Sequence, residues 1–199
     1  MNRGAMTKRI AVALALFLAA CKPAPSGDPG QPPLAGAAIG GEFALVDKAG
    51  KPVHWSDFAG RYRVVYFGYT FCPDACPTDV AVTIKGLTLF AKDHPAQAAR
   101  VQPIFISIDP ARDTPAVVGQ FAAAFSPRLL GLTGTPAQVD KAAKAFAVYY
   151  ARGKDTAGGY LMDHSRVVYL MGPNGQPIDM LPADKGPQAV AATLAKWVR

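Results

Sequence analysis

The feature that most constrains the fold is an apolar run that leads directly into a helix-start signal. Residues 63–69 are almost continuously hydrophobic and rich in β-branched and aromatic side chains, which is typical of a central strand covered on both faces. Pro77 and Asp79 then suit the first turn of a helix, and apolar residues recur at helical spacing from Val80 to Phe90. A buried strand followed at once by a helix predicts an α/β fold.

The alternation continues along the chain. The pattern predicts further elements in turn: strands at 101–108, 129–132 and 147–150, and helices at 113–125 and 135–146. A hairpin at 165–171 and 176–181, around an Asn-Gly turn, and a helix at 188–198 close the chain. Residues 42–47 and 53–55 predict a short hairpin before the first buried strand.

Two cysteines, Cys72 and Cys76, lie between the buried strand and its helix. Unpaired N–H groups and the dipole at a helix start favour a thiolate, which is both a nucleophile and a metal ligand. Three residues separate these cysteines, instead of the two of a Cys-x-x-Cys redox motif. The wider spacing makes room for a metal ion and still permits a disulfide, so both a metal site and a redox-active dithiol stay open.

Two thiolates and one imidazole suit Cu(I) and are acceptable to Cu(II), so the three histidines are candidates for a third ligand. His54 lies in the predicted hairpin and His94 precedes Pro95 in a polar connection, and we interpret both as surface or turn residues. His164 lies just before a predicted strand, on a loop that this fold can bring beside the cysteines. Taken alone, a loop histidine is more often solvated than metal-bound.

Three segments together closely resemble the Sco/SenC family, whose members assist the assembly of cytochrome c oxidase. The segments are residues 64–78, which contain both cysteines, residues 107–115, and Asp163-His164-Ser165. The resemblance covers essentially the whole domain in the family's order and spacing. It implies a thioredoxin-like mixed sheet flanked by helices, with the N-terminal β-hairpin as an extension.

The resemblance also implies that one copper ion is bound through Cys72, Cys76 and His164, and that the two cysteines form a redox dithiol–disulfide pair. Family members deliver copper to the binuclear copper site of oxidase subunit II, or reduce the cysteines of that site. The implied partners are subunit II and a periplasmic thiol reductase or copper donor. Reductases of this fold carry a cis-proline before the penultimate strand. This chain has Arg166 there, which leaves space beside the sulfurs for the histidine.

Several neighbouring residues have both a functional and a structural interpretation. Asp74 could tune the metal or be a solvated turn residue, and Asp163 could orient His164 although adjacent side chains often point apart. Met162 is a soft donor, but it suits the core better. A helix cap and a local ion pair explain the charged residues that follow the second buried strand: Asp109, Arg112 and Asp113.

The N-terminal residues predict export and a lipid anchor. Basic residues up to Arg9 precede an apolar run at 10–20 that is too short to span a bilayer. The sequence Leu-Ala-Ala-Cys21 resembles the bacterial lipobox, in which the cysteine is acylated and becomes the mature N-terminus. We therefore expect a protein of the cell envelope, tethered to a membrane and facing the periplasm. Its three parts are a lipoprotein signal peptide at 1–20, lipidated Cys21 with a Pro/Gly/Ala-rich tether at 21–38, and one domain at 39–199.

The net charge of +7 does not indicate a nucleic-acid partner. Three of these charges lie in the first ten residues, and the remaining +4 is spread along the chain without a cluster of Lys and Arg.

Three functions fit these patterns. The first is a copper-binding assembly factor, and the second is a periplasmic thiol:disulfide reductase or peroxidase in which Cys72 attacks and Cys76 resolves. The third is a redox or copper sensor. Cys-x-x-x-Cys combined with Asp-His-Ser favours the first, whereas Cys-x-x-Cys with a cis-proline would have favoured the second.

Overall fold

The central strand of the structure is the one that the apolar run predicts. In the computed structural model, which describes residues 30–155 and 159–199, this strand is β3 (Tyr62–Gly68), and all seven of its residues are buried. They include Arg63, whose guanidinium donates hydrogen bonds to the carbonyls of Gly172 (2.7 Å) and Pro173 (3.2 Å). Burial on both faces explains why the strand shows no polar alternation.

β3 lies in the middle of a five-stranded mixed sheet with the order β5-β4-β3-β8-β9. The parallel partners on one side are β4 (Val101–Ser107) and β5 (Leu130–Leu132). The antiparallel strands on the other side are β8 (Val168–Met171) and β9 (Pro177–Met180). Because β3 and β4 are parallel, the loops that follow them emerge at the same edge of the sheet.

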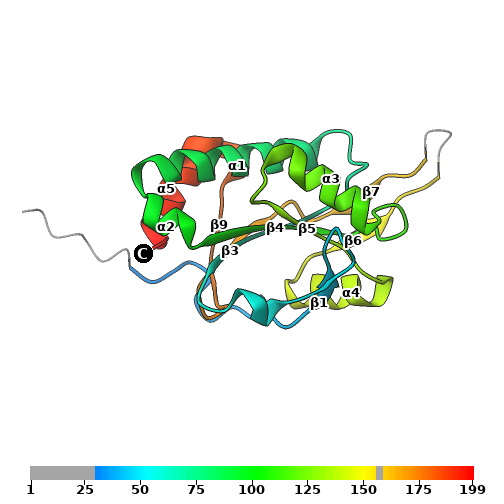
Figure 1. Ribbon diagram of the computed structural model, residues 1–199, viewed down its shortest axis with the longest axis horizontal. Helices are drawn as coiled ribbons and strands as arrows, with labels where there is room; N and C mark the ends of the chain where they lie inside the picture. The colour runs from blue at the N-terminus through cyan, green and yellow to red at the C-terminus, as the bar shows by residue number, and fades with distance from the viewer. Residues whose placement is uncertain (1–29, 156–158) are drawn as a thin grey trace, which may run out of the picture.

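Helices cover both faces of this sheet (Figure 1). One face carries α1 (Ala75–Asp93), α3 (Pro115–Phe125) and α5 (Pro187–Trp197). The other carries α4 (Pro136–Ala145) and the hairpin of β1 (Ala44–Val46) and β2 (Pro52–His54). Three short helices complete the description: η1 (Trp55–Phe58), α2 (Pro95–Ala99) and η2 (Ala183–Lys185). The predicted mixed sheet, its flanking helices and its N-terminal hairpin are confirmed.

The structure corrects the sequence-based elements in three places. α1 begins at Ala75 instead of Pro77, so Cys76 lies inside its first turn. The polar connection predicted at His94 contains the short helix α2, which Pro95 opens. The strand predicted at 147–150 is instead β6 (Tyr150–Arg152), which pairs with β7 (Met162–His164) in a separate two-stranded sheet.

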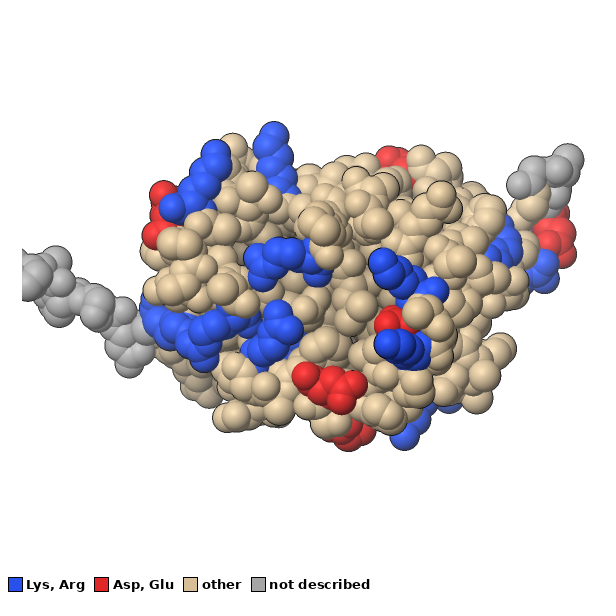
Figure 2. Space-filling view, viewed as in Figure 1, with Lys and Arg blue, Asp and Glu red and all other residues tan. Residues whose placement is uncertain are grey.

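The N-terminal residues that are described contact the domain. Within the predicted tether, the Leu34 N–H donates to the Ile178 carbonyl (3.1 Å) and Leu34 packs against the core, as does Ile39, the first residue of the predicted domain. Among the described residues, no helix has the length and apolar character needed to cross a membrane. Figure 2 shows Lys and Arg in several separate groups on one face of the molecule. The predicted signal peptide and Cys21 lie outside the described residues.

Candidate metal centre

The two domain cysteines lie where the chain leaves β3 and enters α1. Cys76 is fully buried in the first turn of α1, whereas Cys72 lies on the loop before it and is partly exposed. The backbone N–H of Cys76 donates to the Cys72 sulfur at 3.3 Å. Both are free thiols in the described chain. The strand–loop–helix arrangement predicted from the sequence therefore places both cysteines at the start of one helix.

The two sulfurs differ in acidity because their surroundings differ. Burial acts to raise the pKa of the Cys72 thiol, but the backbone N–H groups of Cys76 and Asp74 donate to its sulfur and the net effect is a lowered pKa. Deep burial raises the pKa of the Cys76 thiol to about 12. Cys72 is therefore the sulfur that ionises first.

His164 is the last residue of β7, and its imidazole contacts the buried sulfur of Cys76. Its Nε2 lies 3.3 Å from Cys76 Sγ, and its Nδ1 lies 3.0 Å from the Ser165 carbonyl oxygen. A carbonyl can only accept, so Nδ1 carries the proton and the Nε2 lone pair faces the sulfur. Burial lowers the pKa of His164, which keeps the ring neutral and able to bind a metal.

The environment of His164 corrects its expected place on a loop and decides between the two interpretations of Asp163. The residue belongs to a strand and is half buried, with its ring edge-on to Tyr66 and Tyr69 at centroid distances of 6.1 and 6.0 Å. The Ser165 carbonyl orients the ring, while the exposed Asp163 side chain lies on the other side of the strand.

A carboxylate beside the site joins three elements. Asp79, buried in α1, accepts a hydrogen bond from the Tyr66 hydroxyl (3.0 Å) and two from the Arg166 guanidinium (2.8 and 3.0 Å). The described residues contain no cis peptide bond, so Arg166 does not reproduce a cis-proline turn. The sequence placed Asp79 only in a helix turn. Its position three residues after Cys76, on the same side of the helix, was the available signal.

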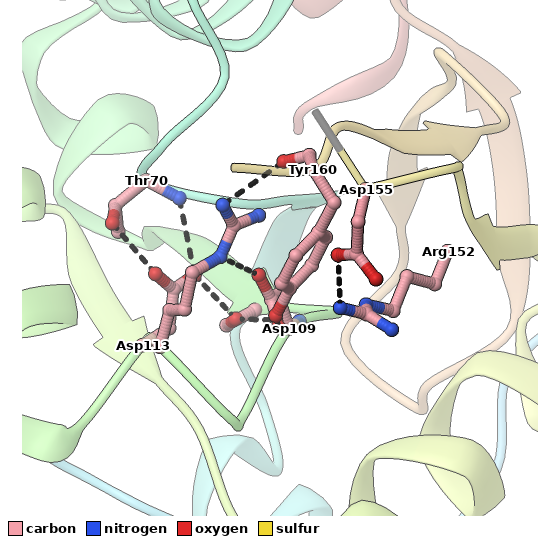
Figure 3. A network of polar contacts seen from close by, with 8 residues as sticks. Thr70, Asp109, Asp113, Arg152, Asp155 and Tyr160 are labelled. Carbon is pink, nitrogen blue, oxygen red and sulfur yellow. Dashed lines mark hydrogen bonds and ion pairs between the residues drawn. The ribbon is translucent and has the colours of Figure 1, made fainter. Parts of the chain in front are cut away.

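A second polar network lies behind the cysteine loop (Figure 3). Asp113 is fully buried and accepts from Thr70, while Asp109 accepts from Arg112 and from the Tyr160 hydroxyl. The predicted ion pair between Asp109 and Arg112 is confirmed at 2.6 Å. The cap of α3 is Thr114, so Asp113 serves another purpose.

The structure also places the other residues that the sequence offered as possible ligands or neighbours of the site. His54 is an exposed residue of β2, and His94 stacks on Phe90 at the start of α2. Met162 is buried in the core, as expected, and Asp74 is exposed at the N-cap position of α1. Among the described residues, no three His, Cys, Asp or Glu side chains already form a metal-ready cluster. Two sulfurs and an imidazole on adjacent segments nevertheless form a donor set that fits a soft metal ion.

Comparisons with known proteins agree with this architecture. The SCO1/SenC family model matches residues 31–199. The human mitochondrial SCO1 homolog is 38% identical over 162 residues, which cover 81% of this chain and 53% of the relative. Protein SenC of Rhodobacter capsulatus is 41% identical over 157 residues, covering 79% and 69% of the two chains. The chain thus spans about half the length of the human relative.

Solved structures show the same fold. Bradyrhizobium japonicum ScoI with copper bound matches with a TM-score of 0.72 and 38% identity, over 80% of this chain and 99% of the other. Yeast Sco1 with copper bound matches with a TM-score of 0.72 and 34% identity, over 80% and 88%. The fold is therefore the thioredoxin-like fold of these proteins, and the chain belongs to the SCO1/SenC family.

Proposed function

We propose that this chain binds copper through Cys72, Cys76 and His164 and acts in the assembly of cytochrome c oxidase. The observation that carries the proposal is the 3.3 Å approach of His164 Nε2 to Cys76 Sγ, with Cys72 on the same helix start. Two sulfurs and an imidazole suit Cu(I) and accept Cu(II). The copper-bound structures of the related ScoI and Sco1 proteins support this choice of metal.

Each proposed ligand has a defined protonation state before the metal arrives. His164 is neutral with its Nε2 lone pair available, and Cys72 ionises below the ordinary thiol pKa. Cys76 must lose a proton when it binds, because burial raises its pKa to about 12. Copper binding should therefore release protons and weaken in acid.

In this proposal copper is a cargo, passed to the binuclear copper site of oxidase subunit II. A periplasmic copper donor or thiol reductase would restore the protein afterwards. Two of the exposed large apolar side chains in the described chain, Phe71 and Leu161, lie one and three residues from a proposed ligand in sequence. A third, Tyr149, belongs to a residue whose backbone carbonyl accepts a hydrogen bond from the N–H of Ser165, next to His164. Such side chains favour a transient protein contact.

The same dithiol supports a second candidate, reduction of the cysteines in the subunit II site. The Cys72 thiolate would attack one sulfur of the partner's disulfide and release the other as a thiolate. Cys76, after losing its proton, would then displace the partner from Cys72, so the partner gains two electrons and a Cys72–Cys76 disulfide forms. The lowered pKa of Cys72 favours this role for it.

We also propose that Cys21 is lipidated and holds the domain at the periplasmic face of a membrane, since the sequence around it resembles a lipobox. A Cys21→Ser variant should leave the membrane fraction or remain an unprocessed precursor, with the fold unchanged. A mature, unmodified protein that keeps Cys21 and fractionates as soluble would contradict this proposal.

Replacement of His164 separates the two candidate functions. In His164→Ala, copper affinity should fall at least about 100-fold and the sulfur-to-Cu(II) charge-transfer absorption should change, because one of three ligands is gone. The Cys72–Cys76 redox couple should persist, since disulfide exchange needs only the sulfurs. The matched control is His94→Ala, which removes another partly buried histidine that packs on an aromatic ring.

Copper titration, absorption spectra and oxidase activity in cells with limiting copper provide the measurements. Loss of oxidase assembly in His164→Ala would support delivery, and normal assembly would support reduction. An unchanged copper spectrum in His164→Ala would refute the ligand assignment.

A further inference from the structure

The last residue of β4 and the loop that follows it toward α3, residues 107–113, contact the loop before α1 and the hairpin that carries His164. The loop before α1 follows β3 and carries Cys72, and the hairpin is formed by β6 and β7. Figure 3 shows the contacts converging on this segment from both sides.

On the cysteine side, Asp113 accepts three hydrogen bonds. The donors are the Thr70 N–H (3.0 Å), the Thr70 hydroxyl (2.6 Å) and the Ser107 hydroxyl (2.5 Å). The carboxylate is completely buried, and burying a carboxylate is costly unless donors surround it. Thr114 already caps α3, so the donors of Asp113 come from the end of β4 and from the loop two residues before Cys72.

On the histidine side, Asp109 and Arg112 together hold Tyr160. The Tyr160 hydroxyl donates to Asp109 (2.8 Å), and the Arg112 guanidinium donates to Asp109 (2.6 Å) and to the Tyr160 carbonyl (2.9 Å). The guanidinium carbon of Arg112 also lies 3.6 Å from the centre of the Tyr160 ring, and that of Arg152 lies 4.0 Å from it. Tyr160 is thus fixed in both its side chain and its backbone.

The β6–β7 hairpin depends on contacts with the rest of the domain to keep its position. Its strands are three residues long and pair with each other, outside the five-stranded sheet, and an isolated two-stranded hairpin is marginally stable. A hydrogen bond from the Met162 N–H to the Tyr69 hydroxyl is a further contact between the hairpin and the cysteine loop. Tyr160 lies four residues before His164, so a shift at Tyr160 would move the imidazole relative to Cys76.

We propose that residues 107–113 are a positioning element that sets the separation between the cysteine loop and His164, with Asp113 holding one side and Asp109, through Tyr160, holding the other. The inference rests on the proposed function, since it concerns the geometry of the same copper site. Asp109, Arg112 and Tyr160 touch none of the three proposed ligands in the contacts described above. They would act through the placement of the hairpin.

Tyr160→Phe tests the histidine side in the full-length chain purified from membranes in mild detergent. The substitution removes the hydroxyl that binds Asp109 and keeps the ring between the two guanidinium groups. The matched control is Tyr149→Phe, which removes an exposed hydroxyl from the same hairpin region. Cu(I) affinity is measured by competition with a chromophoric chelator, together with the Cu(II) absorption spectrum, the alkylation rate of Cys72 and the unfolding midpoint.

The expected result for Tyr160→Phe is a Cu(I) affinity about tenfold weaker and a shifted Cu(II) spectrum, with a Cys72 alkylation rate within about twofold of wild type. Thr70→Ala should show the complementary change, an altered Cys72 alkylation rate, because it removes a hydroxyl that anchors the cysteine loop. Arg112→Lys repeats the test from the other end of the network if Tyr160→Phe folds poorly; because the Arg112 guanidinium also lies 4.8 Å from the centre of the Phe71 ring, this variant should alter the Cys72 alkylation rate as well.

Two results would overturn the inference: copper affinity and spectrum unchanged in both Tyr160→Phe and Arg112→Lys, or an equal loss in Tyr149→Phe. A wild-type protein that binds no copper would instead refute the proposed function itself. The two failures are therefore distinguishable.

Discussion

At the scale of single residues, the chemistry of the site depends on how differently the chain treats two cysteines on one turn. Cys72 receives backbone N–H groups at an exposed helix start, whereas Cys76 is enclosed beside the His164 imidazole and the hydroxyl of Tyr66. One sulfur is thus prepared to react with a partner, and the other is kept protonated until a metal or a disulfide bond replaces its proton.

We predict that alkylation distinguishes the two sulfurs. In the reduced, metal-free protein, iodoacetamide should modify Cys72 first, with a rate that rises with pH and has a midpoint below the ordinary thiol value of 9.0. Cys76, with a pKa of about 12, should stay largely protonated and unmodified through pH 9. Peptide mapping by mass spectrometry gives both rates. Equal labelling of the two cysteines at pH 8 would contradict the assigned environments.

The sequence identified the three candidate ligands but not what prepares them. Cys72 and Cys76 stand out because a cysteine pair at a helix start has a known physical consequence, and His164 stands out through the family resemblance of the residues around it. The Ser165 carbonyl determines that His164 carries its proton on Nδ1, and the rings of Tyr66 and Tyr69 pack edge-to-face against its imidazole. Side-chain contacts of this kind form only after folding and leave no local pattern.

At the scale of elements, Asp79 connects α1 to β3 and to the turn before β8. The Asp79 side chain is 7% exposed, whereas the Arg166 side chain that binds it is 55% exposed. The two partners therefore do not contribute equally. Loss of Arg166 leaves the buried Asp79 carboxylate without its ion-pair partner, but loss of the charge on Asp79 leaves a guanidinium that water can solvate.

This asymmetry predicts an unusual double-variant result. Arg166→Ala should lower the free energy of unfolding by about 2 kcal/mol, because Asp79 keeps only the Tyr66 hydroxyl as a described donor. Asp79→Asn should cost about 1 kcal/mol. The double variant should be more stable than Arg166→Ala alone, since no buried charge remains. Urea denaturation of the three proteins measures this, and simple additivity of the two losses would count against the explanation.

Elements were predictable where burial imposes a long pattern. β3, β4 and the major helices follow from apolar runs and helical spacing, because each packs along most of its length. β6 was misplaced and β7 was missed because these strands are three residues long and are held from outside the hairpin by Asp109 and Arg112, which bind Tyr160. Such short elements owe their structure to tertiary contacts that no local pattern encodes.

At the scale of the whole molecule, the reach of the domain from its proposed anchor depends on which residue first contacts the core. The family match starts at residue 31, and Leu34 already binds the Ile178 carbonyl and packs on the core. If Cys21 is the anchor, twelve residues separate it from Leu34, and even a fully extended chain of that length spans only about 40 Å. Leu34 would then lie within about 40 Å of the membrane, and this limit does not extend to the site at the far end of β3.

We predict that residues 31–38 contribute to stability and not to metal binding. A soluble protein that begins at Ile39 should lose about 1 to 2 kcal/mol of unfolding free energy relative to one that begins at Gln31, because it lacks the packing of Leu34 and its hydrogen bond to β9. Both proteins should bind copper equally, since this segment makes no described contact with the cysteine loop or the β6–β7 hairpin. Urea denaturation and copper titration of the matched pair provide the test. Equal stability would show that the tether extends to residue 38 and that the reach from the membrane is correspondingly longer.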